Sequence, residues 1–317
     1  MISERAGVLL DAFQSIDRAV SGEGHVEPSV VSYIQRLQQA LSQPEPLTLQ
    51  IAKQLHGLRG KEAYLFTGFV VPGLYPEGEN DGPLGTLVLA RALHLAGLIP
   101  MIWVDPQLLD NIMWLAAELA VSVPIKAIDL AQLAECRNEP AVVIAIEKPG
   151  ANDNGIMHTF AGLPVSSGSI SIDALFLEWN AMGTLTMAIG DRGNEIGFGA
   201  LREQVVQWAP GSTDCHCGCT GGVAATTPAQ FLLPAAVSNW GAYGVAASMA
   251  ILARDKRLLL TPAEEERLLR VAAVRGCVDG ICRRGVYGID GLPGATSVAL
   301  VQELQRIAQR AMSEESE

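Results

Sequence analysis

A glycine-rich segment at residues 190–199 carries three oxygen-bearing side chains within five residues, namely Asp191, Asn194 and Glu195. The segment follows the apolar run 183–189, which is typical of a buried strand. The i, i+3 and i+4 spacing would place the three side chains on one face of a helical turn. Converging carboxylate and amide oxygens are the ligands that Mg²⁺, Mn²⁺ and Ca²⁺ prefer. The segment therefore indicates a metal site, and the alternative is a polar turn in which Asp191 caps a helix.

Polar clusters also follow three other apolar runs that are typical of strands. Residues 77–81 follow the first run, Glu147 and Lys148 follow run 141–146, and residues 238–240 follow run 230–237. Ligands of open α/β sheets bind beyond the carboxyl ends of the strands. If the strands are parallel, all four clusters meet at one edge of the sheet, which favours a single site over four unrelated turns.

The clusters at Asp81 and Glu147 have residue types that suit ligand binding and proton transfer. Pro83 at the first position of a helix would make Gly82 the cap and leave Asp81 free to bind a metal or a substrate amine. Glu147 and Lys148 leave a buried strand, and partial burial would raise the glutamate pKa or lower the lysine pKa. Either shift would produce a proton-transfer group, and the alternative is an ion pair at the strand end.

Two weaker candidates are a histidine and a helix start. His158 lies in a loop and could act as a general base or a metal ligand, although a lone loop histidine is usually neither. Asn239, Trp240 and Gly241 open a predicted helix, where an amide and free backbone N–H groups could hold a substrate carboxylate. The alternative is a helix cap beside a core tryptophan.

Two aspartates occur in Asp-Gly pairs near the end of the chain. Asp279 and Asp290 both resemble aspartates of tight turns, and either could complete a metal shell.

The segment Cys215-His216-Cys217-Gly218-Cys219 has the composition of a zinc site but an unusual spacing. Structural zinc usually takes cysteines two to four residues apart together with a second, distant pair. Cys277 and Cys282 could supply that pair, but four residues separate them. The spacing therefore argues against zinc.

Apolar periodicity predicts strands that alternate with helices. The expected strands are 63–71, 98–104, 123–128, 141–146, 183–189 and 230–237. Helices are expected within 1–60 and at 83–96, 106–120, 130–137, 171–182, 241–253, 262–275 and 295–312. This alternation predicts an α/β fold with a mostly parallel sheet flanked by helices, with an acidic ligand site at the carboxyl ends of the strands.

Composition limits the classes of partner. The 317 residues include 22 Lys and Arg against 34 Asp and Glu, a net charge of −12, which argues against nucleic-acid binding. We find no apolar run of about 18 residues, so no membrane partner is expected. Six cysteines do not make a disulfide framework in a chain of this length, and with no charged-then-apolar leader we expect reduced thiols and a cytoplasmic location.

Five segments together resemble one family, the metal-associated C-terminal catalytic domain of D-glutamate cyclases. The segments are Asp81-Gly82-Pro83-Leu84-Gly85, Glu147-Lys148-Pro149-Gly150-Ala151-Asn152, Gly190 to Gly199, Val237-Ser238-Asn239-Trp240-Gly241-Ala242-Tyr243, and Val278-Asp279-Gly280 with Asp290-Gly291-Leu292-Pro293. The motifs Gly-Asp-x-Gly-Asn-Glu-Ile-Gly and Ser-Asn-Trp-Gly are specific, whereas the Asp-Gly turns are weak signals.

The resemblance implies a lyase that converts D-glutamate to 5-oxo-D-proline and water, with a divalent metal near the acidic loops. Two features depart from the pattern: Arg192 stands where we expect glycine, and the segment at 215–219 looks local to this chain. Members of the family can also carry a second, N-terminal domain, so activity could require a partner chain. D-Glutamate or a related amino acid is the expected small-molecule partner, and a homo-oligomer remains open.

The expected metal is Mg²⁺ or Mn²⁺, held by Asp191 and Glu195 with Asn194, Asp81 or Asp279 assisting. Such an ion would neutralise and polarise the γ-carboxylate of the substrate, which is otherwise a poor electrophile.

The remaining site residues would handle the proton and the substrate. Glu147 or Lys148, with His158 as a further candidate base, would take the amine proton and help water to leave. Arg192, Asn239 and the helix start that follows would hold the α-carboxylate. The alternative function is a metal-dependent phosphohydrolase or phosphate-ligand enzyme, since Asp, Asn, Glu and glycine also suit phosphate with Mg²⁺. A non-catalytic sensor of an amino acid or metal is a third hypothesis.

We predict three parts in the chain. Residues 1–62 form a helical segment packed on the core, residues 63–312 form the α/β catalytic domain, and residues 313–317 form a disordered tail.

Overall fold

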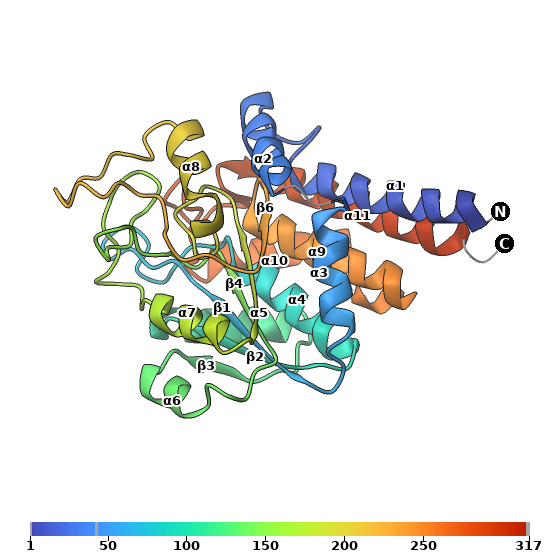
Figure 1. The fold of residues 1–317 in the computed structure, drawn as a ribbon, viewed down its shortest axis with the longest axis horizontal. Helices are drawn as coiled ribbons and strands as arrows, with labels where there is room; N and C mark the ends of the chain where they lie inside the picture. The colour runs from blue at the N-terminus through green and yellow to red at the C-terminus, as the bar shows by residue number, and fades with distance from the viewer. Residues whose placement is uncertain (1, 42–43, 315–317) are drawn as a thin grey trace.

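A computed structural model describes residues 2–41 and 44–314 (Figure 1). Its described part contains a six-stranded sheet, in which all neighbouring strands are parallel and the order is β3-β2-β1-β4-β5-β6. The strands are β1 (Glu62–Thr67), β2 (Ile99–Val104), β3 (Ile125–Ala127), β4 (Val142–Ile146), β5 (Leu185–Gly190) and β6 (Phe231–Pro234). The predicted α/β class and all six predicted strands are confirmed.

The helices also follow the predicted alternation. They are α1 (Ile2–Val20), α2 (Pro28–Ala40), α3 (Leu47–His56), α4 (Pro83–Leu95), α5 (Leu109–Glu118), α6 (Leu130–Glu135), α7 (Asp173–Ala181), α8 (Arg202–Trp208), α9 (Ser238–Ala253), α10 (Pro262–Val274) and α11 (Gly294–Glu314). Short 3₁₀ turns at Pro106–Leu108, Gly199–Leu201 and Lys256–Leu258 join them. Sequence patterns missed α8 and the hairpin of β7 (Gly288–Ile289) and β8 (Leu292–Pro293), because both are too short to show periodicity.

The strand order reverses between β1 and β4, and this reversal decides where the helices lie. Right-handed connections place helices on opposite faces when the strand order runs in opposite directions. Helix α4 therefore packs on one face together with α3 and α9, and α7 packs on the other (Figure 1). On that second face Trp179 of α7 meets Phe66 of β1, with ring centroids 5.6 Å apart. The reversal leaves a crevice at the carboxyl ends of β1 and β4, where open α/β sheets bind ligands.

The N-terminal helices belong to the same apolar core as the sheet. Ile16, Leu37 and Leu55, one from each of α1, α2 and α3, are buried with the strand side chains in one cluster. Helix α1 runs beside α11, so the two ends of the described chain lie together (Figure 1). Helix α11 continues to Glu314, and residues 315–317 of the predicted tail lie outside the described part of the chain. No described helix is long and apolar enough to cross a membrane.

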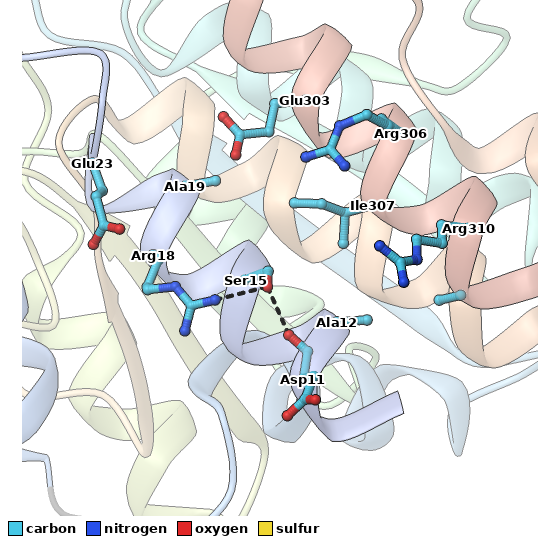
Figure 2. Close-up of a pocket in the computed structure, with 11 residues that line it drawn as sticks. Asp11, Ala12, Ser15, Arg18, Ala19, Glu23, Glu303, Arg306, Ile307 and Arg310 are labelled. Carbon is cyan, nitrogen blue, oxygen red and sulfur yellow. Dashed lines mark hydrogen bonds between the residues drawn. The ribbon is translucent and has the colours of Figure 1, made fainter. Parts of the chain in front are cut away.

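A groove of about 450 Å³ runs between α1 and α11. In Figure 2, Arg306 and Arg310 of α11 face Asp11 and Ser15 of α1 across it. Its charged side chains are of both signs. Because the groove lies between two surface helices, it is separate from the strand ends that the sequence indicates as the site.

Helix α10 begins with the predicted capping box of Thr261 and Glu264. The next residue, Glu265, is buried and accepts hydrogen bonds from Ser297 Oγ (2.5 Å) and the Tyr243 hydroxyl (2.8 Å). Burial outweighs these bonds and raises the pKa of Glu265 to about 7. A carboxyl group whose pKa is higher in the folded state destabilises the fold as pH rises from the unfolded to the folded value.

We expect Glu265→Gln to stabilise the protein in a pH-dependent way. The variant should match the wild type near pH 4, and its relative stability should rise by up to about 3 kcal/mol between about pH 4.5 and pH 7 and then level off. Over this range unfolded Glu265 ionises and gains solvation, whereas burial keeps the folded carboxyl group protonated. Urea unfolding of both proteins across this pH range measures the difference. A difference that does not change with pH would contradict the assignment.

Candidate functional site

An acidic cavity of about 320 Å³ lies at the carboxyl ends of the central strands. Its polar walls come from the segments that follow β1, β4 and β5 and from the β7–β8 region. The lining residues include Tyr75, Glu79, Glu147, Thr159, Phe160, Asp191, Arg192, Asn194, Arg283 and Asp290. The sequence prediction that the acidic clusters meet at one edge of the sheet agrees with this arrangement.

The carboxylates around this cavity are almost fully buried. The five with exposures of 7% or less are Glu79, Asp81, Glu147, Asp191 and Glu195. Burial, followed by repulsion from neighbouring carboxylates, raises the pKa of Asp81 to about 8 and raises the pKa values of Glu79, Glu147 and Asp191 well above their usual range. So much buried negative charge is costly unless cations or protons neutralise it.

Arg192 is the cation in direct contact with these carboxylates. Its Nε lies 3.3 Å from Asp191 Oδ2 and its Nη2 lies 3.2 Å from Asp290 Oδ2. The guanidinium stands 5.8 Å from the ring centre of Phe160, and its side chain is 35% exposed. Arg192 thus lines the cavity with part of its donor set open to a ligand, where the sequence predicts a substrate-binding residue.

Glu195 organises the acidic loop after β5. Its Oε2 accepts from Gly193 N at 2.7 Å, and its Oε1 accepts from Arg192 N at 3.1 Å and Asp191 N at 3.3 Å. The segment is an irregular loop and not the helical turn that the spacing would allow. Asp191 and Glu195 come together because a carboxylate collects the loop's own backbone donors, as in an anion-binding nest.

Asp81 caps a helix that is distant in sequence. Its Oδ1 accepts from Asn239 N (2.8 Å) and Gly82 N (3.0 Å), and its Oδ2 accepts from Ser238 N (3.0 Å). The carboxylate therefore occupies the start of α9, where backbone N–H groups and the helix dipole favour an anion. Gly82 is the cap of α4, as predicted, but Asp81 is not left without partners.

Glu147 enters the cavity through an unusual backbone conformation. Its φ is +47°, in the left-handed region that non-glycine residues seldom adopt. Glycine is required at position 82, because a Cβ there would lie 2.6 Å from Glu147 Cβ. The Glu147 carboxylate accepts from Ser238 Oγ at 2.5 Å. This strained strand end aims the Glu147 carboxyl group at the cavity.

The two Asp-Gly aspartates have different environments. Asp279 accepts from the backbone N–H groups of Ile281, Cys282 and Gly291, so its carboxylate is used within the turn. Asp290 instead lines the cavity beside Arg192. Between the two candidates for completing a metal shell, the geometry favours Asp290 over Asp279.

Asn194 and His158 are linked through the backbone. Asn194 Nδ2 donates to the His158 carbonyl oxygen at 3.0 Å, and Asn194 Oδ1 is buried without a protein partner. The imidazole of His158 is buried beside cysteines, with Nε2 3.2 Å from Cys217 Sγ. The ring thus lies outside the lining of the acidic cavity.

Lys148 pairs with a carboxylate on the other side of the strand end. Its ammonium lies 2.6 Å from Asp105 Oδ2, and both side chains are fully buried. Asp105 Oδ1 also accepts from Ile170 N at 2.7 Å. Lys148 therefore lies outside the lining of the cavity, in the strand-end ion pair that was the alternative interpretation.

The start of α9 packs against the core. Asn239 Nδ2 donates to the Asn80 carbonyl and its Oδ1 accepts from Gly85 N, so both amide groups are engaged. Trp240 is fully buried and donates to Ser297 Oγ at 2.8 Å. At Gly241 a Cβ would approach Ile189 Cγ2 to 2.5 Å. These residues position helices behind the cavity.

The donor set around the cavity suits a hard divalent cation. One oxygen from each of Glu147, Asp191 and Glu195 lies within 4.8 Å of the others, and the same holds for Asp81, Asp191 and Asp290. Carboxylate oxygens are typical ligands of Mg²⁺ and Mn²⁺. The unpartnered Asn194 Oδ1 adds an oxygen at the same wall. A divalent metal is therefore compatible with this site.

Sequence reasoning missed Glu79 and Ser238 as site residues. Glu79 lines the cavity, and Ser238 holds Glu147. Glu79 is two residues from Asp81 and Ser238 is next to Asn239, so both belong to polar clusters that the sequence already indicates. Only the direction of each side chain distinguishes the members of such clusters.

The fold and cavity define an α/β protein with a small-molecule site at the switch point of a parallel sheet. Residues 26–305 match the family described as D-glutamate cyclase-like, C-terminal, and the chain belongs to this family, whose name suggests an enzyme of that type. The chain is also 29% identical over 195 residues to the mitochondrial D-glutamate cyclase of Homo sapiens. That alignment covers 56% of this chain and 30% of the human protein.

We expect Mg²⁺ or Mn²⁺ to stabilise the protein, because a cation relieves the repulsion among the buried carboxylates. At a metal concentration about 100 times Kd the gain would be about 3 kcal/mol. It should be larger at alkaline than at acid pH, since burial raises the pKa of Asp191 and a protonated carboxyl group does not ligate. Thermal unfolding with metal and with chelator measures it. Asp191→Asn should abolish the metal-dependent gain, whereas Asp110→Asn, an exposed control, should keep it.

We expect Lys148→Met to lower the free energy of unfolding by about 3–5 kcal/mol, because Asp105 would remain buried without its cation. The double variant Lys148→Met with Asp105→Asn should recover much of the loss, since no unpaired charge remains. Urea unfolding measures both proteins. A single variant as stable as the wild type would show that the pair contributes nothing.

Proposed function

We propose that this protein is a D-glutamate cyclase that converts D-glutamate to 5-oxo-D-proline and water with the help of a divalent metal. The observation that carries the proposal is the juxtaposition of Arg192 with the carboxylates Glu147, Asp191 and Asp290 in one small cavity. A zwitterionic amino diacid needs both charge types at its binding site. Membership of the D-glutamate cyclase-like family supports the same reaction.

The cavity favours one orientation of the substrate. Arg192 would hold the α-carboxylate with its open guanidinium donors, since bidentate pairing with carboxylate is a strong interaction of arginine. The buried carboxylates would attract the ammonium group. Holding the amine against the γ-carboxylate supplies much of the rate enhancement, because ring closure then needs no further search for the reacting geometry.

Ring closure must move two protons. The amine nitrogen forms a bond to the γ-carbon, one C–O bond breaks, and the two protons lost by the ammonium group leave in the water molecule. Glu147 is the best-positioned relay, because it lines the cavity and because burial, followed by repulsion from Glu195, raises its pKa well above its usual range. Ser238, which donates to Glu147, would keep this carboxyl group in place.

A divalent cation bound by Asp191 with Asp290 would supply Lewis-acid polarisation of the γ-carboxylate. Glu195 and Asp81 contribute indirectly, since their backbone hydrogen bonds hold the acidic loop and α9 in position. Lys148 and His158 are not needed in this scheme, because their side chains are engaged outside the cavity.

Incubation of D- and L-glutamate with the pure protein, followed by chiral chromatography, tests the proposal. We expect 5-oxo-D-proline from D-glutamate only, with Mg²⁺ or Mn²⁺ present, and a loss with chelator. Glu147→Gln and Asp191→Asn should each reduce turnover by at least about 100-fold, the scale of a lost proton-transfer group, while Asp110→Asn stays active.

Two other outcomes would contradict the proposed cyclase activity. Metal-dependent release of phosphate from generic phosphate esters, without turnover of glutamate, would favour the phosphohydrolase. Ligand-dependent stabilisation by D-glutamate without any product would favour a sensor.

A further inference from the structure

A second cluster of metal-ligating side chains lies next to the acidic cavity. His158 comes from the loop after β4, and Cys215, Cys217 and Cys219 come from the loop between α8 and β6, on the side of the molecule away from the chain ends (Figure 1). One atom from each side chain lies within 4.8 Å of the other three. His158 is fully buried and Cys217 is exposed, so the cluster sits at the protein surface with one edge open.

The distances in this cluster lie within about 0.4 Å of those in a tetrahedral zinc site. Zn–S bonds of about 2.3 Å and Zn–N bonds of about 2.0 Å imply S···S separations of about 3.8 Å and N···S separations of about 3.5 Å. The sulfurs of Cys215 and Cys219 are 3.4 Å apart, and those of Cys215 and Cys217 are 3.9 Å apart. His158 Nε2 lies 3.2 Å from Cys217 Sγ and 3.9 Å from Cys219 Sγ.

Hydrogen bonds from neighbouring residues hold the two loops together. Asn152 Nδ2 donates to Cys219 Sγ at 3.3 Å, the kind of supporting contact that orients a thiolate ligand. Asn154 Nδ2 donates to the Cys219 carbonyl at 2.5 Å, and His216 N donates to the Gly162 carbonyl at 2.8 Å. The fourth ligand is thus brought by tertiary structure, and not by a second cysteine pair.

We propose that His158, Cys215, Cys217 and Cys219 bind one Zn²⁺ in a structural site that is separate from the acidic cavity. Three thiolates and an imidazole are soft and borderline ligands that select zinc over Mg²⁺ or Mn²⁺. With all four positions filled by protein, the ion would have no open coordination position for catalysis.

The zinc site would fasten one wall of the acidic cavity. Thr159 and Phe160, which follow His158 directly, line that cavity, and the His158 carbonyl accepts from Asn194. Zinc would thereby tie this wall to the loop at 215–219. The proposal does not depend on the cyclase reaction, because the ligands and the metal differ from those of the acidic site.

Metal analysis of the full-length protein tests the proposal directly. Protein isolated with zinc available should contain about one zinc per chain, and replacement by Co²⁺ should give the intense thiolate-to-cobalt charge-transfer absorption of a tetrahedral site. Cys217→Ser and Cys219→Ser should lose at least about nine-tenths of this zinc. His216→Ala and Cys282→Ser are the matched controls and should retain it, since neither side chain belongs to the cluster.

Alkylation of the wild-type protein provides a test that does not rely on folded variants. With zinc bound, Cys215, Cys217 and Cys219 should resist alkylation, and a chelator should make them reactive, while exposed Cys282 reacts in both cases. Equal labelling of the three cysteines with and without zinc would overturn the proposal. Cobalt spectra without thiolate bands would also overturn it.

Discussion

The central constraint in this protein is that several carboxylates must stay close together although they repel one another and are cut off from water. Backbone N–H groups meet part of this cost: the loop after β5 surrounds the Glu195 carboxylate, and the start of α9 surrounds that of Asp81. These two side chains fix a loop and a helix through the backbone N–H groups that they accept from. Glu147, Asp191 and Asp290 are left facing the cavity, where their charge can attract a cation or an ammonium group.

The parallel sheet brings the acidic segments together. Its strands are buried in the core and end at one edge, so the segments after β1, β4 and β5 start from fixed points only one strand apart. Helices α3, α4 and α9 cover one face with small and apolar side chains. Gly241, Trp240 and Asn239 lie at that contact, so this specific motif has a packing role.

The wall opposite the strand ends is built from loops that share a small apolar cluster, which includes Phe69, Met157 and Val165. Phe160 and its neighbours stand over Arg192, and their anchoring depends on polar contacts such as Asn194 to the His158 carbonyl. A metal ion bound at His158 would add stiffness beside this small apolar cluster. The acidic site would then carry the catalytic chemistry, and the cysteine cluster would stabilise the wall of the cavity.

The sequence by itself determined the alternation of strands and helices, the caps at Gly82 and Thr261, and the gathering of acidic residues at one edge of the sheet. These follow from local periodicity and from the geometry of parallel strands. Only the tertiary structure decided which member of each cluster faces the cavity, as with Asp290 over Asp279 and Glu147 over Lys148. It also joined His158 to cysteines 57 or more residues away. Side-chain direction and long-range pairing depend on contacts between distant segments, which no local pattern encodes.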